Sequence, residues 1–527
     1  MAAGAAALAF FGRPLAAQDW SQPVRGSWVR ADEKARPGDS LLAGPAGGCE
    51  IVVDPGEPTA VRQAAHFLAG DIERISGYRP PILAAPDGRG IPIRLATLGG
   101  AVRPPAAVDT ARLAGRWEAY QIVAGPDAVW LVGSDFRGTA YASYTLSERL
   151  GIDPLYLWTE YAPVRHAALI LQGCGQFFDS PTFRYRGFFH DDEDILPRPF
   201  DAEGYPLQTG TVPKIWYERF FETALRLRLN MVAPYVRVQR PFEIQQMASD
   251  WGLFYTSHHY DILHSNPWGF TRFGLAAARH AGAQWDWFKN REGMLAFWRG
   301  GILENRGLDC IWPVGLRGTQ DAGYSFPPGM GRDDRIKAYR DAIDAQIALT
   351  KSLLPANRTP IFHFTLYTEM LDLYRQGRLG VPNDVIVVWP DDNDGIMRAL
   401  PEPAGRGKHG VYYHLAYYTR YLYPTKQITH TVSPMRIADQ FRHIVDAGAT
   451  EYMLLNVTEL REYAMEARMV SELCWDAGRT VGSPDAADRY IRWWSREYFG
   501  AGAADGAAEA YRQFYSLLDS ADKIWSG

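Results

Sequence analysis

After residue 183 the chain alternates between short apolar segments and longer amphipathic segments. The clearest apolar segment, 385–389, is too short and too apolar for anything but a strand buried on both faces. Alternation of such strands with amphipathic helices predicts a parallel sheet with crossover helices. The predicted strands are 186–190, 231–236, 253–258, 309–316, 360–367, 385–389, 411–415 and 452–457, and the predicted helices between them include 217–229, 242–251, 333–354 and 434–447.

Eight parallel strands favour closure into a (β/α)8 TIM barrel over an open sheet, and we place this α/β barrel at 184–480. Segment 264–306 is too long for a plain loop and helix, so we expect an insertion over the barrel mouth. Residues 481–527 carry two further helical patterns, at 486–498 and 506–524, and are expected to begin a C-terminal helical region.

Residues 19–183 have a different pattern, which predicts a smaller α+β domain ahead of the barrel. A turn containing Gly125-Pro126-Asp127 separates two apolar segments, and this arrangement is typical of a β-hairpin. Acids and histidines do not gather at the predicted strand ends of this domain. Its predicted strands are 50–53, 91–96, 120–123 and 128–133, and its predicted helices are 61–76 and 138–150.

Composition excludes several classes of protein. The net charge of −5 and the absence of a Lys/Arg-rich run argue against a nucleic-acid partner. No apolar run reaches the roughly 18 residues that would suggest a membrane span. The four cysteines lie far apart and form no spacing typical of zinc, so no metal site is predicted. An aromatic content of 13% fits a cleft that stacks sugar rings, but it fits a large aromatic core equally well.

The first residues are rich in Ala and end in Leu15-Ala16-Ala17-Gln18. Such a small-residue ending resembles the cleavage site of a secretory signal, although the basic start of such a signal is missing. We therefore expect 1–18 to be the remnant of a signal, and the protein to be periplasmic or secreted. A disordered Ala-rich tail is the alternative.

Acids, amides and histidines gather where the predicted barrel strands end. Active sites of TIM barrels are built at the carboxyl ends of the strands, so these side chains are candidates for one site. Strand 385–389, for example, runs directly into Asp391, Asp392 and Asn393. The other strand-end candidates are His190 and 191–194, His258, His259, Arg317, Asp321, Tyr367, Glu369, His414, Asn456 and Glu459.

Two carboxylates in an aromatic cleft suit glycoside hydrolysis, in which one acid protonates the leaving oxygen and the other activates water or attacks carbon. Each candidate also has a structural interpretation. The acids at 191–194 could cap a helix, and His414 could be a core residue. His258 and His259 resemble half of a metal site, but neighbours on a strand face opposite sides, so at most one is expected to face the barrel interior.

Several motifs follow one another in an order that resembles glycoside hydrolase family 115, the xylan α-1,2-glucuronidases. The N-terminal domain contributes 132–141, with Tyr144, Ser147 and Gly151-Ile152 after it. The Asp-Asp-Asn and Tyr-Tyr-His motifs are fairly specific. The barrel motifs are 186–194, 257–259, Leu316-Arg317-Gly318 with Asp321, Tyr367 with Glu369, 389–395, 411–415 and Asn456-Val457.

The resemblance implies an inverting exo-enzyme without metal or cofactor that removes (4-O-methyl-)glucuronic acid from xylan or xylo-oligosaccharides. It implies that Asp321 and Glu369 form the acid/base pair, with Glu369 the better candidate for activating water. It also implies a set of substrate-binding residues: Asp192, His258, Arg317, Tyr367, Trp389, Asp391, Asn393 and His414.

The chain departs from the family pattern at a few positions. Tyr260 stands where the family usually has Glu, and Thr368 replaces a Lys that could pair with the carboxylate of a uronic acid. Arg317 or Arg461 could supply that cation instead. Two alternatives stay open, namely a glycosidase for a different, neutral sugar and a non-catalytic carbohydrate-binding barrel. The oligomeric state is also open, with a homodimer as one possibility.

Overall fold

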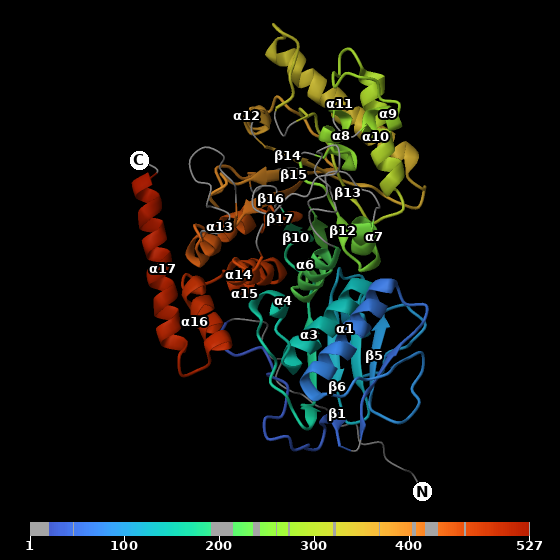
Figure 1. Ribbon diagram of the computed structural model, residues 1–527, viewed down its shortest axis with the longest axis vertical. Coiled ribbons are helices and arrows are strands. Elements are labelled where there is room, and N and C mark those ends of the chain that lie inside the picture. The colour runs from blue at the N-terminus through green and yellow to red at the C-terminus, as the bar shows by residue number, and fades with distance from the viewer. Residues whose placement is uncertain are drawn as a thin grey trace, which may run out of the picture. The chain divides into compact units, whose positions relative to one another are not determined.

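The computed structural model describes residues 20–45, 47–190, 214–234, 243–259, 261–271, 274–319, 323–367, 369–402, 407–416, 430–457 and 460–525, with backbone alone at 268, 369 and 520–525. The chain divides into two compact units (Figure 1). Unit 1 comprises Met1–Tyr156, Glu160–Pro181 and Arg496–Tyr498, and unit 2 comprises Leu157–Thr159, Thr182–Ser495 and Phe499–Gly527.

Unit 1 contains a six-stranded mixed sheet in the order β4-β3-β5-β7-β6-β9. Strands β3, β5 and β7 are parallel, and β6 is antiparallel to both β7 and β9. The predicted hairpin is confirmed, because β6 and β7 pair from Tyr120↔Gly133 to Ala124↔Val129. The strands are β3 (Glu50–Val53), β4 (Ile82–Leu83), β5 (Pro92–Thr97), β6 (Tyr120–Ala124), β7 (Val129–Gly133) and β9 (Cys174–Phe178).

The helices of unit 1 begin and end at residues with clear local reasons. Helix α1 (Thr59–Ser76) stops at Gly77, whose φ of 80° is readily adopted only without a Cβ atom. The carboxylate of Asp135 accepts the backbone N–H of Gly138 and so caps helix α3 (Phe136–Leu150). Short elements complete the unit: α2 (Thr110–Leu113), α4 (Tyr156–Thr159, shared with unit 2) and a sheet of β2 (Gly47–Gly48), β1 (Ser40–Gly44) and β8 (Leu169–Leu171).

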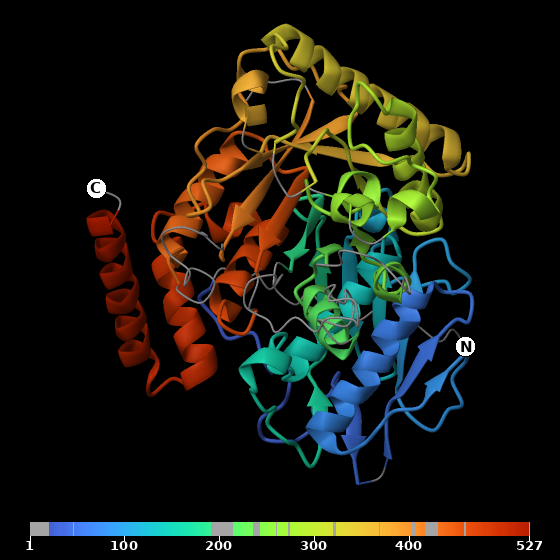
Figure 2. The ribbon, with the colours of Figure 1, turned by 45° about the horizontal axis from the view of Figure 1, so that its top comes forward.

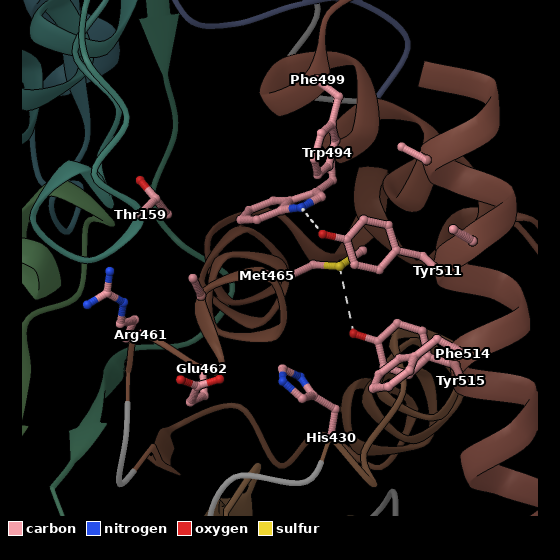
Figure 3. Close-up of a pocket in the computed structure, with 13 residues that line it drawn as sticks. Thr159, His430, Arg461, Glu462, Met465, Trp494, Phe499, Tyr511, Phe514 and Tyr515 are labelled. Carbon is pink, nitrogen blue, oxygen red and sulfur yellow. Dashed lines mark hydrogen bonds between the residues drawn. The ribbon is translucent and has the colours of Figure 1, made fainter. Parts of the chain in front are cut away.

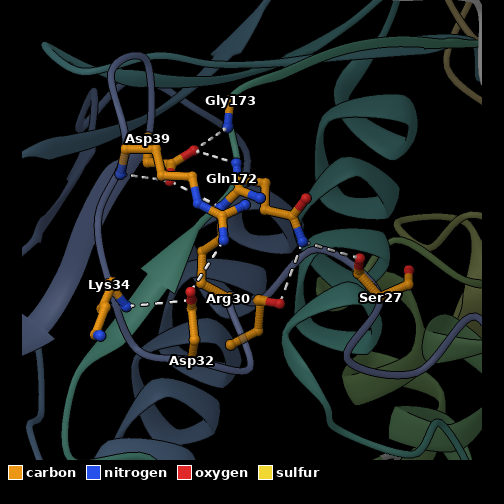
Figure 4. Close-up of polar contacts among 9 residues, drawn as sticks. Ser27, Arg30, Asp32, Lys34, Asp39, Gln172 and Gly173 are labelled. Carbon is orange, nitrogen blue, oxygen red and sulfur yellow. Dashed lines mark hydrogen bonds and ion pairs between the residues drawn. The ribbon is translucent and has the colours of Figure 1, made fainter.

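Asp39 pairs with Arg30 within the segment before β1 and also links this segment to the one between β8 and β9 (Figure 4). Both oxygens of Asp39 accept hydrogen bonds from the guanidinium of Arg30, at 2.9 and 3.1 Å. Asp39 also accepts the backbone N–H groups of Arg36 and Gly173. The hydrogen bond with Arg30 lowers the pKa of Asp39, which keeps this carboxylate ionised.

Unit 2 is built around eight parallel strands in the order β12-β11-β10-β17-β16-β15-β14-β13 (Figure 2). The two ends of this sheet meet in a parallel bridge between Tyr255 and Cys310, so the predicted (β/α)8 barrel is confirmed. Each predicted strand overlaps an observed one, although β10 and β16 begin earlier than predicted and β15 ends one residue later. The strands are β10 (Tyr185–Phe189), β11 (Met231–Ala233), β12 (Phe254–Tyr255), β13 (Ile311–Pro313), β14 (Ile361–Thr365), β15 (Val385–Pro390), β16 (Lys408–His414) and β17 (Tyr452–Asn456).

Helices separate most of the barrel strands along the chain. Four of them, η1, α8, α9 and α10, lie between β12 and β13 in the sequence. Beyond the barrel, α16 and α17 lie side by side, joined by an ion pair between Arg512 and Asp488 (Figure 1). The helices are α6 (Lys214–Arg226), α7 (Glu243–Asp250), η1 (Ile262–His264), α8 (Pro267–Thr271), α9 (Leu275–Ala278), α10 (Arg291–Asn305), α11 (Arg332–Leu353), α12 (Glu369–Arg375), α13 (Pro434–Asp446), α14 (Ala464–Trp475), α15 (Ala477–Thr480), α16 (Ala486–Phe499) and α17 (Ala504–Trp525).

Side chains of the barrel strands alternate between the interior and the surrounding helices. On β10, Phe189 contacts Tyr412 of the distant strand β16, at 6.1 Å between ring centroids, so both rings point inward. Phe188 instead packs against Phe220 of α6, outside the barrel. The same alternation places Tyr413 against Phe441 of α13. Within the described part of the chain, no helix is both long and apolar enough to cross a membrane.

Candidate active site

Asp391 and His414 form a buried pair at the carboxyl ends of β15 and β16. Oδ1 of Asp391 lies 2.6 Å from Nδ1 of His414, and Oδ2 accepts the backbone N–H of the same residue at 2.8 Å. Oδ1 also accepts the backbone N–H of Asn393 at 3.0 Å. The two side chains are no more than 1% exposed. These bonds fix the imidazole in one orientation, because a carboxylate can only accept and Nδ1 must therefore carry the proton.

The turn after Asp391 is held in an uncommon conformation. Asn393 has a φ of 68°, in the left-handed region, where Asn is one of the few residues tolerated besides Gly. Its Oδ1 atom is buried and has no hydrogen-bond partner among the described residues. This amide oxygen lies close to the Asp391–His414 pair. It is suited to accept a hydrogen bond from a hydroxyl group of a ligand.

Inward-facing side chains of other strands surround the pair. Tyr412 lies 4.3 Å from His414 between ring centroids, and its hydroxyl accepts the amide of Asn456, on β17, at 3.2 Å. The ring of His258 lies 4.7 Å from that of Phe189 on β10. Four strands, β10, β15, β16 and β17, therefore contribute to one region of the barrel mouth.

His259, Tyr367 and Arg317 lie at the mouth near strands β12 to β14. The ring of His259 stacks on that of Tyr367 at 4.3 Å and also approaches Tyr412 at 6.1 Å. The guanidinium of Arg317 lies 5.8 Å from the Tyr367 ring. The expectation that only one of the two adjacent histidines faces the barrel interior was wrong. Strand β12 ends at Tyr255, so the strict alternation of a strand does not extend to them.

Two predicted residues point away from this region. Trp389 is only 4% exposed, its indole N–H donates to Nδ1 of His409, and its ring packs against Tyr374 of α12. These contacts are those of a core residue between strand and helix, and they give the predicted substrate contact no support. His190 packs against Trp216 of α6, and burial lowers its pKa to about 3.

Several predicted residues lie outside the described residues. Asp192 and Asp321 fall there entirely, as do Tyr260 and Thr368. Glu369 is described as the first residue of α12, four positions after β14 ends, but its side chain is not described. The roles predicted for Asp192, Asp321 and Glu369 therefore stay predictions.

Sequence reasoning missed a layer of polar side chains inside the barrel. Nε2 of His363, on β14, lies 3.3 Å from the hydroxyl of Thr256, and its ring stacks on Tyr452 of β17. Burial, together with the neighbouring His259, lowers the pKa of His363 to about 3 and keeps it neutral. A histidine at an inward position of a buried strand was the signal that could have revealed this layer.

A separate pocket of about 590 Å³ lies among α14, α16 and α17 (Figure 3). Its walls include Trp494, Tyr511 and Phe514, with Arg461 and His430 at its edge. None of the ten predicted site residues lines it. We place the candidate active site at the barrel mouth, because the histidines, tyrosines and carboxylate that can do chemistry converge there. Among the described residues, no three His, Cys, Asp or Glu side chains are grouped so as to hold a metal ion.

Polar side chains gathered at the carboxyl ends of the strands are the usual arrangement of a TIM-barrel active site. The chain belongs to glycosyl hydrolase family 115, whose family model matches residues 178–523. No curated protein sequence matches the chain. The family match covers the whole barrel, so the resemblance first seen in short motifs is confirmed.

Several solved structures of glycoside hydrolases have a fold similar to that of this chain. The chain is similar to BtGH115A, a family GH115 4-O-methyl-α-glucuronidase with specificity for decorated arabinogalactans, with 24% identity and a TM-score of 0.75. The match covers 91% of this chain but only 62% of the solved one. Weaker similarity links it to a GH138 enzyme targeting pectin rhamnogalacturonan II, with 12% identity, a TM-score of 0.52 and coverage of 89% and 69%. The N-acetyl-β-hexosaminidase of Streptomyces plicatus matches with 15% identity, a TM-score of 0.53 and coverage of 92% and 95%.

Proposed function

We propose that this protein is an exo-acting α-glucuronidase that removes terminal (4-O-methyl-)glucuronic acid from plant polysaccharides such as xylan. The observation that carries the proposal is the Asp391–His414 pair, set beside Asn393 and Tyr412 in a family 115 barrel. Such a fixed set of acceptors and donors is suited to hold a sugar ring by its hydroxyls.

In this proposal the reaction is an inverting hydrolysis. Glu369 activates the attacking water, and Asp321 protonates the departing glycosidic oxygen. Glu369 is the first residue of α12, four positions after β14, on the carboxyl side of that strand, where a barrel builds its site. Asp391 takes no proton in this scheme, because its role is to orient the imidazole of His414.

The negative charge of a uronic acid requires a cation, and Arg317 is our candidate. It is 6% exposed, it lies beside Tyr367, and its guanidinium matches the planar shape of a carboxylate. His258 lies at the same mouth and would assist. In this way Arg317 replaces the Lys that stands in the family at the position of Thr368.

The polymer that carries the uronic acid has two candidates. Xylan follows from the motifs of the family, and decorated arabinogalactan is the specificity named for BtGH115A. Both polymers lie outside the cell, which agrees with our proposal that the protein is periplasmic or secreted. The competing functions are a glycosidase for a neutral sugar and a barrel that binds carbohydrate without cleaving it.

Product analysis tests the proposal. The protein is incubated separately with aldouronic acids from glucuronoxylan and with glucuronic-acid-decorated arabinogalactan, and released sugars are separated by anion-exchange chromatography. We expect free (4-O-methyl-)glucuronic acid from at least one, appearing first as the β-anomer in proton NMR. Release of a neutral sugar, or of nothing from a broad panel, would contradict the proposal, and an α-anomer would contradict inversion.

A further inference from the structure

The turn that follows β12 is closed around the hydroxyl of Ser257, which directly precedes His258 and His259. This hydroxyl donates to the backbone carbonyl of Asp261 at 2.9 Å and lies 2.7 Å from Nδ1 of His264. Since the hydroxyl has a single proton, Nδ1 of His264 must be the donor in the second bond. One serine therefore ties both ends of the turn together.

The same turn has two consecutive residues in a strained conformation. Leu263 and His264 have φ values of 50° and 54°, which residues with a Cβ atom seldom adopt. Such strain persists only where the surrounding structure enforces it. Gly301 of α10 supplies part of that enforcement, because a Cβ atom there would lie 2.1 Å from the Ser265 hydroxyl and 2.4 Å from the Leu263 carbonyl oxygen.

His264 is buried deeply for a polar residue. Its ring lies between Tyr255 and Trp312, at 4.8 and 4.6 Å between ring centroids, and the residue is 4% exposed. Its Nε2 atom is buried without a hydrogen-bond partner among the described residues. Burial, with a contribution from His363, lowers the pKa of His264, so the ring is neutral. An apolar side chain would fill this place at lower cost, so packing alone does not account for a histidine.

We propose that His264 is a positioning residue that acts through Ser257 to hold the imidazoles of His258 and His259 at the barrel mouth. Neither His264 nor Ser257 touches substrate in this scheme. The effect on kinetics rests on the proposed function, since it assumes that His258 contacts the sugar. The expected consequence is a loss of substrate binding rather than of the chemical step.

Steady-state kinetics on the released uronic acid test this role. Ser257→Ala removes both bonds of the turn, and His264→Phe removes the Nδ1–H donor while it keeps a ring between Tyr255 and Trp312. Each is expected to raise KM about tenfold with kcat within a factor of three, the pattern for lost uniform binding. Ser257→Thr, which keeps the hydroxyl, should restore KM. The double variant should be no worse than Ser257→Ala alone, because that substitution already removes the bond to His264.

The matched control is Ser143→Ala, which deletes the buried hydroxyl of a serine in α3 of unit 1 that donates to the carbonyl of Ala64. Its melting temperature should fall about as much as that of Ser257→Ala, with KM unchanged. An unchanged KM in Ser257→Ala, or a failure of Ser257→Thr to restore it, would overturn the inference.

A second measurement separates this inference from the proposed function. If the wild-type protein releases no uronic acid, the proposed function fails and the kinetic test has no signal. The imidazole NMR signals of His258 and His259, assigned with His258→Gln and His259→Gln, then provide the readout. Ser257→Ala and His264→Phe must shift both signals, and signals that stay in place would end the proposal.

Discussion

Two histidine–carboxylate pairs in unit 2 use almost the same bond for different purposes. His414 and Asp391 meet at 2.6 Å between Nδ1 and Oδ1, and His430 and Glu466 meet at 2.8 Å between Nδ1 and Oε1. The first carboxylate also accepts two backbone N–H groups of the barrel mouth. The second accepts the hydroxyl of Tyr515, on α17, at 2.6 Å.

The surroundings decide what each pair does. Glu466 belongs to α14, so its bond to Tyr515 fastens α17 to α14. Asp391 instead orients the imidazole ring of His414 at the barrel mouth, among inward-facing side chains of β10, β15, β16 and β17. The bond between a histidine and a carboxylate is therefore not evidence of catalysis by itself, and the position of the pair at strand ends is what distinguishes the candidate site.

The largest expected effect tests whether catalysis belongs to the barrel mouth at all. Glu369→Gln should lower kcat by at least about 100-fold, because an amide cannot accept the proton of the attacking water. The measurement is release of uronic acid from aldouronic acids, with unfolding in urea as the control for folding. A rate close to that of the wild type would remove Glu369 from the mechanism.

Asp391→Asn should lower kcat/KM on the order of 10- to 100-fold, the range seen when a partner that orients a histidine at a metal site is lost. The amide keeps the shape of the carboxylate but cannot accept all three hydrogen bonds that Asp391 receives. Glu466→Gln is the matched substitution in the other pair and should leave kcat/KM per folded molecule unchanged. Equal losses in the two variants would show that the position of the Asp391–His414 pair at the strand ends gives it no special role in catalysis.

Glu466→Gln should instead lower the free energy of unfolding, by about 2 kcal/mol, because a buried acceptor of two hydrogen bonds is weakened. Urea denaturation monitored by tryptophan fluorescence measures it. If stability does not change, the pair does not hold α17 to α14.

Tyr515→Phe should have a smaller effect, about 1 kcal/mol, since it removes one hydrogen bond and keeps the ring. Limited proteolysis gives a local readout, with faster cleavage of α17 than of the barrel expected. Cleavage at the wild-type rate would assign the stability of α17 to apolar packing alone.

The smallest effect concerns pH. Burial alone would lower the pKa of His430, but its hydrogen bond to Glu466 and the charges of Glu466 and Glu462 raise it above its usual value. The pair therefore contributes its full stabilisation below the pKa of an unfolded histidine and loses it as pH rises through the higher folded pKa. The stability difference between wild type and His430→Gln should be largest below the pKa of an unfolded histidine, about 6.5, and should shrink as pH rises through the higher folded pKa. A constant difference would show that the charge of His430 does not matter.

Much of the fold could be predicted, because its signals are local. Strand 385–389 is continuous in apolar residues, and the hairpin between β6 and β7 has its turn residues in sequence. The helix predicted at 138–150 is observed as α3, which begins two residues earlier. Each of these features depends on neighbours in the chain, so periodicity and turn chemistry are enough to find it.

The candidate site was predicted less completely. The approximate set of strand-end residues was visible, but Trp389 was placed with the substrate and His363 was overlooked. Both errors concern the direction of a side chain. Trp389 shares the sequence motif with Asp391, yet its ring enters the layer between β15 and α12.

The amino-acid sequence by itself determined which segments become strands and helices, and it placed the polar residues at the ends of the barrel strands. Only the tertiary structure decided which of those residues meet. Asp391 and His414 are 23 positions apart, and their contact requires β15 and β16 to lie side by side in register. The physical reason is that burial patterns act along a few consecutive residues, whereas hydrogen bonds between strands depend on how the whole barrel closes.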